Sequence, residues 1–274
     1  MDVSVIIVNY NTKNYIIDCI NSVIQKTKDI NYEIIIVDNN SYDDSVNEIK
    51  KKFPITGSSN ITIVENKENL GFGMANNEGF KRAQGKYLFC LNPDTILLNN
   101  AVKILCDFME SHKECAASGG NLYDKNNKPV HSFGYGDDIK SLLLRKTLLK
   151  YFFPNQYIKI KNYEKFIDRT KITEVNHITG ADLMLRKSAI DQIGGFSGRF
   201  FMYFEETELE VRLKRAGYEI YFVPEAKIIH FEGVTKNKES TFYYKNSIVE
   251  YYKTCYGEAW GEIAELLVKR NNFK

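Results

Sequence analysis

Four short apolar runs recur in the first hundred residues, and a polar stretch follows each of them. After each polar stretch comes a segment whose apolar residues are spaced as on one face of a helix. Successive strand–helix units of this kind predict parallel strands joined by right-handed crossovers. We therefore expect an α/β fold with a mostly parallel central sheet flanked by helices. The expected strands are Val3–Val8, Glu33–Asp38, Ile61–Glu65 and Tyr87–Leu91.

The remainder of the chain predicts shorter strands and a helical C-terminal part. Ser41, three residues before Asp44, predicts a capped helix that ends near Lys52. We find no internal repeat and no low-complexity linker, so we expect one domain over residues 1–235 and a helical extension over residues 236–274. The further expected strands are Ala116–Gly120, Glu174–Ile178, Ala181–Arg186, Tyr218–Val223 and Lys227–His230.

Polar residues and glycines stand after successive strands, where an open α/β sheet binds its ligands. The first strand–helix turn has no glycine and no Walker A sequence is present, which argues against a dinucleotide or P-loop site. A nucleotide site built from side chains remains, in which Asp38 accepts a hydrogen bond from a base and Tyr10 stacks. Each residue alone is more often a turn or cap former, and it is their recurrence at successive strand ends that favours the nucleotide site. The candidates are Asn9, Tyr10, Asn11, Asp38, Asn40, Asn69, Gly71, Gly73 and Asn76.

The fourth strand ends in Asn92, Pro93 and Asp94. Proline cannot donate to a sheet ladder, so the strand stops there and the Asp94 carboxylate turns away from the sheet. A carboxylate in this place suits a hard divalent cation shared with phosphate oxygens. The alternative is an ordinary strand-to-loop turn.

Composition narrows the class of protein. The formal net charge is +2, with 37 basic and 35 acidic residues, so the chain as a whole predicts no binding to nucleic acid. Five cysteines form no CxxC pair, which argues against a disulfide framework or a zinc site and favours the cytoplasm. No stretch reaches 18 apolar residues and no basic leader is seen, so we expect neither export nor a spanning helix.

One segment, residues 139–166, differs from the rest because it contains seven lysines and arginines, one glutamate and many apolar residues. Two interpretations stay open. The segment is either a solvated helix packed by one face on the domain, or a peripheral contact with the inner face of the cell membrane.

Five motifs occur in order along the chain: VSVIIVNYN, IIIVDNNSYDDS, NKENLGFGMANNEGFKRAQGKYLFCLNPDT, ITGADLMLRKSAIDQIGGFSGRFFMYFEETELEVRLKRAGYEIYFVPEAKIIHFEG and FYYKNSIVEYYKTCYG. Together they resemble a family 2 inverting glycosyltransferase, and more narrowly its rhamnosyltransferase-like branch. The likeness covers nearly the whole chain and is weakest from Tyr123 to Thr173. It implies the GT-A fold, a nucleotide-diphosphate-sugar donor and a Mg²⁺ or Mn²⁺ ion, with residues 1–98 as the donor half and 99–235 as the acceptor half.

The resemblance also implies roles for single residues. Asp38 matches the base-recognition aspartate. Asn92-Pro93-Asp94 stands where many members have Asp-x-Asp, so Asp94 is assigned to the metal and Asn92 to a ribose or water contact. His230 matches a histidine that completes the metal site in some relatives; otherwise it is a structural histidine at a strand end.

Glu205-Glu206 matches a pair whose second member is the catalytic base, with Glu205 and Glu208 as alternatives to Glu206. Without the other motifs, this cluster is an acidic helix start favoured by the helix dipole. Gly180, Ala181 and Asp182 are expected to line the floor between donor and acceptor, with Asp182 or Glu205 contacting sugar hydroxyls.

The predicted reaction is transfer of rhamnose or another hexose from a dTDP- or UDP-sugar to a glycan or lipid-linked glycan in surface polysaccharide synthesis. One carboxylate takes the acceptor proton in a single displacement. The alternatives are a UDP-hexose transferase of the same fold, a non-catalytic sugar-nucleotide-binding scaffold and a nucleotidyltransferase. NYNTKN does not resemble the glycine-rich phosphate loop that the last of these needs.

Overall fold

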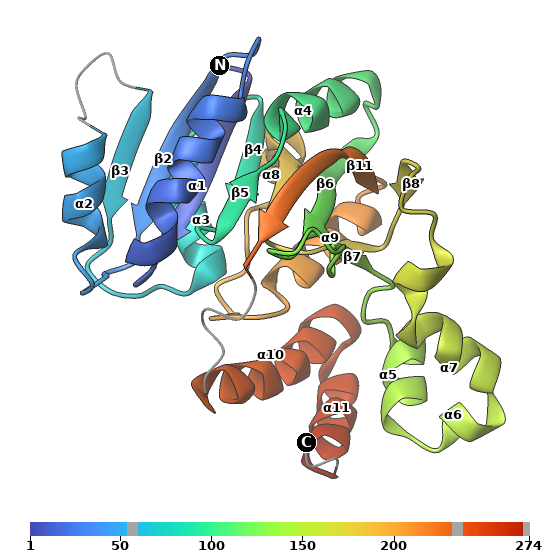
Figure 1. Cartoon of the computed structure of the whole chain (residues 1–274). Helices are drawn as coiled ribbons and strands as arrows, with labels where there is room; N and C mark the ends of the chain where they lie inside the picture. Colours follow the sequence, from blue (N-terminus) through green and yellow to red (C-terminus); the bar gives the residue numbers. More distant parts are fainter. Residues whose placement is uncertain (54–59, 232–237, 271–274) are drawn as a thin grey trace.

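In a computed structural model, which describes residues 1–53, 60–231 and 238–270, one large sheet is flanked by helices (Figure 1). Within these residues the sheet has nine strands in the order β3-β2-β1-β4-β10-β6-β11-β5, with β8 beside β11, while β7 and β9 form a separate pair. The strands are β1 (Val3–Asn9), β2 (Tyr32–Asp38), β3 (Ile61–Glu65), β4 (Tyr87–Leu91), β5 (Thr95–Leu97), β6 (Cys115–Tyr123), β7 (Phe133–Gly134), β8 (Thr173–Glu174), β9 (His177–Ile178), β10 (Asp182–Arg186) and β11 (Glu219–His230).

The helices follow the expected alternation in the first half and continue into two C-terminal helices. They are α1 (Lys13–Lys26), α2 (Ser45–Lys52), α3 (Phe72–Phe80), α4 (Ala101–Ser111), α5 (Ile139–Lys146), α6 (Leu149–Phe152), α7 (Pro154–Lys161), the 3₁₀ helix η1 (Tyr163–Phe166), α8 (Lys187–Ile193), α9 (Glu205–Arg215), α10 (Lys238–Tyr256) and α11 (Glu258–Arg270).

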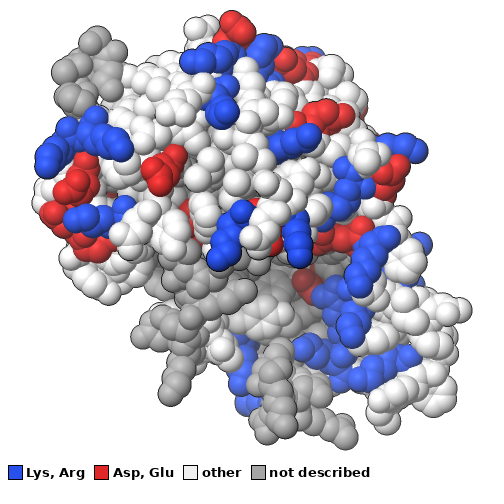
Figure 2. All heavy atoms as spheres, viewed as in Figure 1, with Lys and Arg blue, Asp and Glu red and all other residues white. Residues whose placement is uncertain are grey.

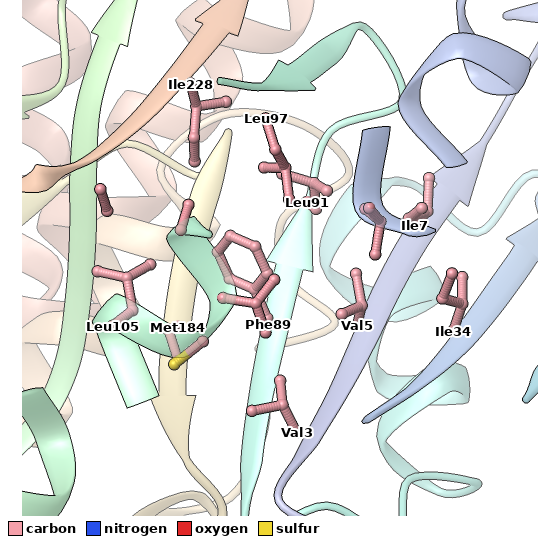
Figure 3. Packing of buried hydrophobic residues seen from close by; sticks show 14 of the residues in the cluster. Val3, Val5, Ile7, Ile34, Phe89, Leu91, Leu97, Leu105, Met184 and Ile228 are labelled. Carbon is pink, nitrogen blue, oxygen red and sulfur yellow. The ribbon is translucent and has the colours of Figure 1, made fainter. Parts of the chain in front are cut away.

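The four N-terminal strands pair in parallel, as the strand–helix units predict. Alternate residues of β1 face opposite sides of the sheet. Val3, Val5 and Ile7 pack in one hydrophobic cluster with α1 and α4, and Ile6 and Val8 pack in a second cluster with α3, α8 and α9. Figure 3 shows part of the first cluster. Burial on both faces explains why β1 reads as a continuous apolar run.

The second half of the sheet differs in detail from the expected strands. The two strands expected at Tyr218–Val223 and Lys227–His230 form one strand, β11 (Glu219–His230), with a register shift between Phe222 and Lys227. The short strand β5 was not expected from the sequence. It pairs antiparallel with β11 so that Thr95 lies opposite His230. This pairing brings the end of β11 to the turn that follows β4.

The expected cap of α2 is wrong in detail. The residue before the helix is Asp44, whose φ of 64° is left-handed and whose side chain makes no capping hydrogen bond. The Ser41 hydroxyl is used elsewhere: it accepts hydrogen bonds from the Asn9 side chain and the Asn11 backbone. Ser41 therefore ties the loop after β2 to the loop after β1.

The C-terminal helices form a third hydrophobic cluster with α5 and with the segment before α9. Its largest fully buried side chains are those of Tyr251, Tyr252 and Phe200. Leu142 of α5 joins them. Among the described residues, no helix combines the length and the apolar character needed to cross a membrane.

Candidate active site

A cavity of about 500 Å³ opens at the carboxyl ends of β1 and β4. Ten of the residues predicted as site residues line it. The lining also includes residues that were not predicted as site residues. Among these are His131, a residue of the loop after β2 and residues of the segment before α9. The predicted residues on the lining are Tyr10, Asn69, Gly71, Asn92, Asp94, Gly180, Ala181, Glu205, Glu206 and His230.

Asp94 and His230 face each other in this cavity. Nε2 of His230 lies 3.4 Å from Oδ1 of Asp94. Two ligands at right angles on a Mg²⁺ ion lie about 3 Å apart, so this pair fits two positions of a divalent cation's shell. Among the described residues, no group of three or more His, Cys, Asp or Glu side chains is arranged to hold a metal.

Glu205 and Glu206 begin α9 and both border the cavity. Glu205 is buried, and its burial, together with the adjacent Glu206 carboxylate, holds the pKa of Glu205 well above its usual range. The raised pKa means that the Glu205 carboxyl favours its protonated form. Oε2 of Glu205 and Oε2 of Glu206 are both buried without a hydrogen-bond partner among the described residues, so this observation does not distinguish the two side chains. The raised pKa of Glu205 leaves Glu206 as the candidate base.

The next acids of α9 hold the site together. Glu208 receives two hydrogen bonds from Arg212, at 2.7 and 2.9 Å, and does not border the cavity. This placement removes Glu208 as an alternative base. Glu210 accepts from the backbone N–H of Ile178 at 2.8 Å and contacts Nδ1 of His177 at 2.6 Å. Because Ile178 lies just before the floor residues Gly180 and Ala181, Glu210 ties the floor to the helix that carries Glu206.

The segment before α9 holds an uncommon backbone. Tyr203 and Phe204 both have positive φ, 72° and 68°, a conformation that costs an aromatic residue about 1–3 kcal/mol. Helix α10 holds the segment in place: the Ser247 hydroxyl donates to the Met202 carbonyl at 2.8 Å, and four aromatic pairs join the two segments. These pairs are Phe201–Tyr243, Tyr203–Tyr244, Phe204–Tyr244 and Phe204–Tyr251. The C-terminal part thus shapes one wall of the cavity.

Four of the predicted nucleotide contacts do not border the cavity. Asn9 is buried and donates to Asp38 Oδ1 at 2.7 Å, while Asp38 Oδ2 accepts from the Ser41 backbone at 3.0 Å. The Asn11 side chain accepts from the Tyr42 backbone, and Asn40 is an exposed residue with a left-handed φ of 66°. Asn9, Asn11 and Asp38 therefore help to build the loops that carry Tyr10, because their side chains form hydrogen bonds within the protein.

The glycine-rich segment is held by a residue that sequence reasoning did not assign. The Asn39 side chain donates to Asn69 Oδ1 at 2.7 Å and accepts from the Leu70 backbone at 3.0 Å. The position of Asn39, directly after Asp38 at the end of a strand, is the feature of the sequence from which its role could have been predicted. Gly73 and Asn76 do not border the cavity: a Cβ at Gly73 would lie 2.9 Å from Phe196, and Asn76 bonds the Phe72 carbonyl.

Gly71 lies where the glycine-rich segment crosses the segment before α9. Its φ is +79°, and a Cβ there would lie 2.2 Å from the Phe201 carbonyl oxygen. We expect Gly71→Ala to lower the free energy of unfolding by several kcal/mol, because left-handed strain of about 1 kcal/mol is joined by a backbone clash. The matched control is Gly217→Ala, whose φ is +87° with no atom within 4 Å among the described residues. Denaturant unfolding that gives equal losses for the two variants would contradict the tight crossing.

Asp182 lies in β10 under the floor and does not border the cavity, so the structure does not support a direct sugar contact. Its Oδ2 accepts from the Gly120 backbone at 2.6 Å, and its Oδ1 is buried without a partner among the described residues. Burial raises the pKa of this carboxyl well above its ordinary value.

The raised pKa of Asp182 predicts a pH dependence of stability. The unfolded carboxyl loses its proton near pH 4, whereas the folded one keeps it to higher pH. The folded state then binds more protons, so stability falls as pH rises from about 4 through the folded pKa. Asp182→Asn keeps an acceptor for Gly120 and removes this titration. We expect the melting temperature of Asp182→Asn to fall less between pH 5 and pH 8 than that of the wild type. The control is Asp191→Asn, an exposed residue, whose melting temperature should fall as much as that of the wild type. An equal fall for Asp182→Asn and the wild type would contradict the prediction.

The model of Glycosyl transferase family 2 matches residues 4–194, more than half of the chain. The chain belongs to this family. Among its relatives are the N-acetylglucosaminyl-diphospho-decaprenol L-rhamnosyltransferase of Mycobacterium tuberculosis (24% identical, over 75% of this chain and 68% of that protein) and rhamnosyltransferase WbbL of Escherichia coli (27%, over 59% and 61%). These relatives support the rhamnosyltransferase-like branch of the family.

Solved structures confirm the GT-A fold of this family 2 glycosyltransferase. GalNAc-T7 with UDP, GalNAc and Mn²⁺ aligns with a TM-score of 0.68 at 17% identity, over 98% of this chain and 54% of that one. Staphylococcus aureus TarS 1–349 in complex with UDP-GlcNAc aligns with a TM-score of 0.63 at 15% identity, over all of this chain and 68% of that one. The chain therefore spans about half to two thirds of these larger proteins.

Proposed function

We propose that the chain is an inverting glycosyltransferase that moves rhamnose or another hexose from a dTDP- or UDP-sugar to a glycan or lipid-linked glycan of a surface polysaccharide, at the cytoplasmic face of the membrane. The observation that carries the proposal is one cavity bordered by both the Asp94–His230 pair and Glu206. The two rhamnosyltransferase relatives support a deoxyhexose donor. The similar GalNAc-T7 and TarS structures were solved with UDP and with UDP-GlcNAc, which favours the second candidate, a UDP-hexose transferase.

Donor binding is assigned to the side of the cavity formed by the strand ends. The nucleobase stacks on Tyr10, which is partly exposed and touches Tyr42 edge-on with ring centroids 6.4 Å apart. Asn69 and the Gly71 backbone border the sugar-phosphate region, and Asn92 contacts the ribose or a water. Asp94 and His230 would hold Mg²⁺ or Mn²⁺, which when bound stabilises negative charge on the departing diphosphate as a Lewis acid.

The acceptor enters on the side of Gly180, Ala181 and Glu206. Glu206 takes the proton from the acceptor hydroxyl while that oxygen attacks the anomeric carbon from the face opposite the diphosphate. Inversion follows because a single displacement needs one base and no enzyme nucleophile. In this scheme residues 1–98 are the donor half, residues 99–235 the acceptor half and residues 236–274 an extension that shapes the cavity wall.

The first test is a thermal-unfolding panel of the purified chain with Mn²⁺ and dTDP, UDP, GDP, CDP or NAD. A ligand of the folded state raises the unfolding temperature by mass action, so we expect a Mn²⁺-dependent rise with dTDP or UDP alone. The base that gives the larger rise decides between the two donor candidates. No rise with any nucleotide would contradict the proposed donor site. A rise with a nucleotide but no transfer would support a non-catalytic sugar-nucleotide-binding scaffold.

A further inference from the structure

Exposed apolar side chains gather in one short part of the chain. Helix α6 has no buried residue, and the exposed side chains there include Leu148, Tyr151 and Phe152, which are 70%, 71% and 77% exposed. Clusters of large apolar residues on a surface mark contacts with a partner. We call residues 148–161 the tip. Its exposed large apolar residues are Leu148, Leu149, Tyr151, Phe152, Phe153 and Ile158.

The tip is held by its neighbours rather than packed into the domain. Leu142 and Leu144 of α5 are buried, and Leu142 joins the cluster of the C-terminal helices. Ile160 is the buried residue of α7. Helices α5, α6 and α7 form a lobe that projects away from the sheet at the lower right of Figure 1. Of the basic segment, α5 therefore packs on the protein as a solvated helix would, whereas the tip, together with Phe166 of η1, presents apolar residues to the outside.

Positive charge surrounds these apolar residues. Residues 139–163 contain six lysines and arginines and no acid. The nearest acids are occupied at the root of the lobe: Asp137 pairs with Arg145 at 2.8 Å, Asp138 caps α5, and Glu164 pairs with Arg169 at 2.7 Å. Figure 2 shows Lys and Arg gathered on this lobe. The tip itself contributes Lys150, Lys159 and Lys161.

The combination of positive charges and apolar groups on the tip distinguishes between three classes of partner: a second copy of the chain, nucleic acid and an anionic bilayer. A second copy docking through the same face would bring like charges together, and nucleic acid would leave six large apolar groups without a contact. An anionic bilayer matches both, since leucine and aromatic side chains enter the boundary of headgroups and acyl chains while lysines lie at the anionic headgroups. We propose that the tip is a membrane-binding surface that inserts Leu148, Tyr151 and Phe152 into an anionic bilayer.

This surface is connected to the cavity. His131, which borders the cavity, contacts the Glu164 carboxylate of η1 at the root of the lobe. Attachment through the tip would hold the acceptor side of the cavity close to the membrane, where the sugar of a lipid-linked acceptor is found. This last step rests on the proposed function; binding to the bilayer does not.

Co-sedimentation of the whole chain with vesicles tests the proposal without donor or acceptor, so its failure is separate from failure of the transferase assignment. We expect binding to phosphatidylglycerol–phosphatidylcholine vesicles at low salt, weaker binding at high salt, and little binding to phosphatidylcholine alone. Phe152→Ser should lower the partition coefficient about tenfold or more, and each of K150Q, K159Q and K161Q about fivefold. These surface changes should leave thermal unfolding and nucleotide binding unchanged.

The matched control is Leu266→Ser, an exposed apolar residue on α11 outside the tip, which should bind vesicles like the wild type. Absence of wild-type binding at low salt overturns the proposal, and so does equal binding of Phe152→Ser and the wild type. A wild-type dimer that Phe152→Ser converts to a monomer would assign the tip to a second copy instead.

Discussion

Glu206→Gln is expected to lower turnover by about 10²- to 10⁴-fold, the usual contribution of a general base. The amide keeps the size of the side chain but cannot take the acceptor proton. Nucleotide binding should stay close to that of the wild type, because Glu206 lies on the acceptor side of the cavity. Release of dTDP or UDP from the donor, with a lipid-linked glycan or with water as acceptor, measures the effect.

Glu205→Gln is the matched control, one residue away on the same helix. Burial holds the pKa of Glu205 well above its usual range, so the wild-type side chain already favours a neutral form that glutamine resembles. We expect turnover within a few-fold of the wild type. If Glu205→Gln loses turnover and Glu206→Gln keeps it, the two roles must be exchanged.

Asp94→Asn is expected to abolish most of the stabilisation that a nucleotide gives in the presence of Mn²⁺. A nucleotide at 100 times its Kd stabilises the folded state by about 2.7 kcal/mol, and a Kd that is 100-fold weaker leaves only about 0.4 kcal/mol. The loss has a direct cause, because an amide oxygen is a neutral and weaker ligand for a hard cation than a carboxylate.

The control for this experiment is Asp107→Asn on the exposed side of α4, where the acid pairs with Lys103. Its nucleotide-dependent rise in unfolding temperature should equal that of the wild type. Wild-type behaviour of Asp94→Asn with Mn²⁺ and dTDP or UDP would show that the cation is bound elsewhere or that the nucleotide needs none. His230→Ala should act in the same direction as Asp94→Asn but less strongly, since a carboxylate remains.

Local sequence patterns determined the first half of the fold. The runs Val3–Val8 and Tyr87–Leu91 are buried on both faces, and burial of that kind has a direct signature in apolar residues. Parallel strands bring their carboxyl ends to one edge of the sheet, which is why the sequence alone predicts a site near Tyr10, Asn92 and Asp94. The likeness in motifs, not periodicity, pointed to Glu206 and His230.

Only the tertiary structure decided which of the candidate residues border the cavity. His230 reaches Asp94 because β5 and β11 pair in a register that no local pattern encodes. Asp38 and Asp182 look like ligand residues in the sequence, yet both are buried away from the cavity lining, Asp38 bonded to Asn9 and Asp182 bonded through Oδ2 to the Gly120 backbone. Hydrogen bonds between residues far apart in the chain determine whether a polar side chain is available to a ligand, and the sequence alone does not give those distances. Contacts with distant parts of the chain likewise decide that α5 is packed on the protein while the tip that follows it is exposed.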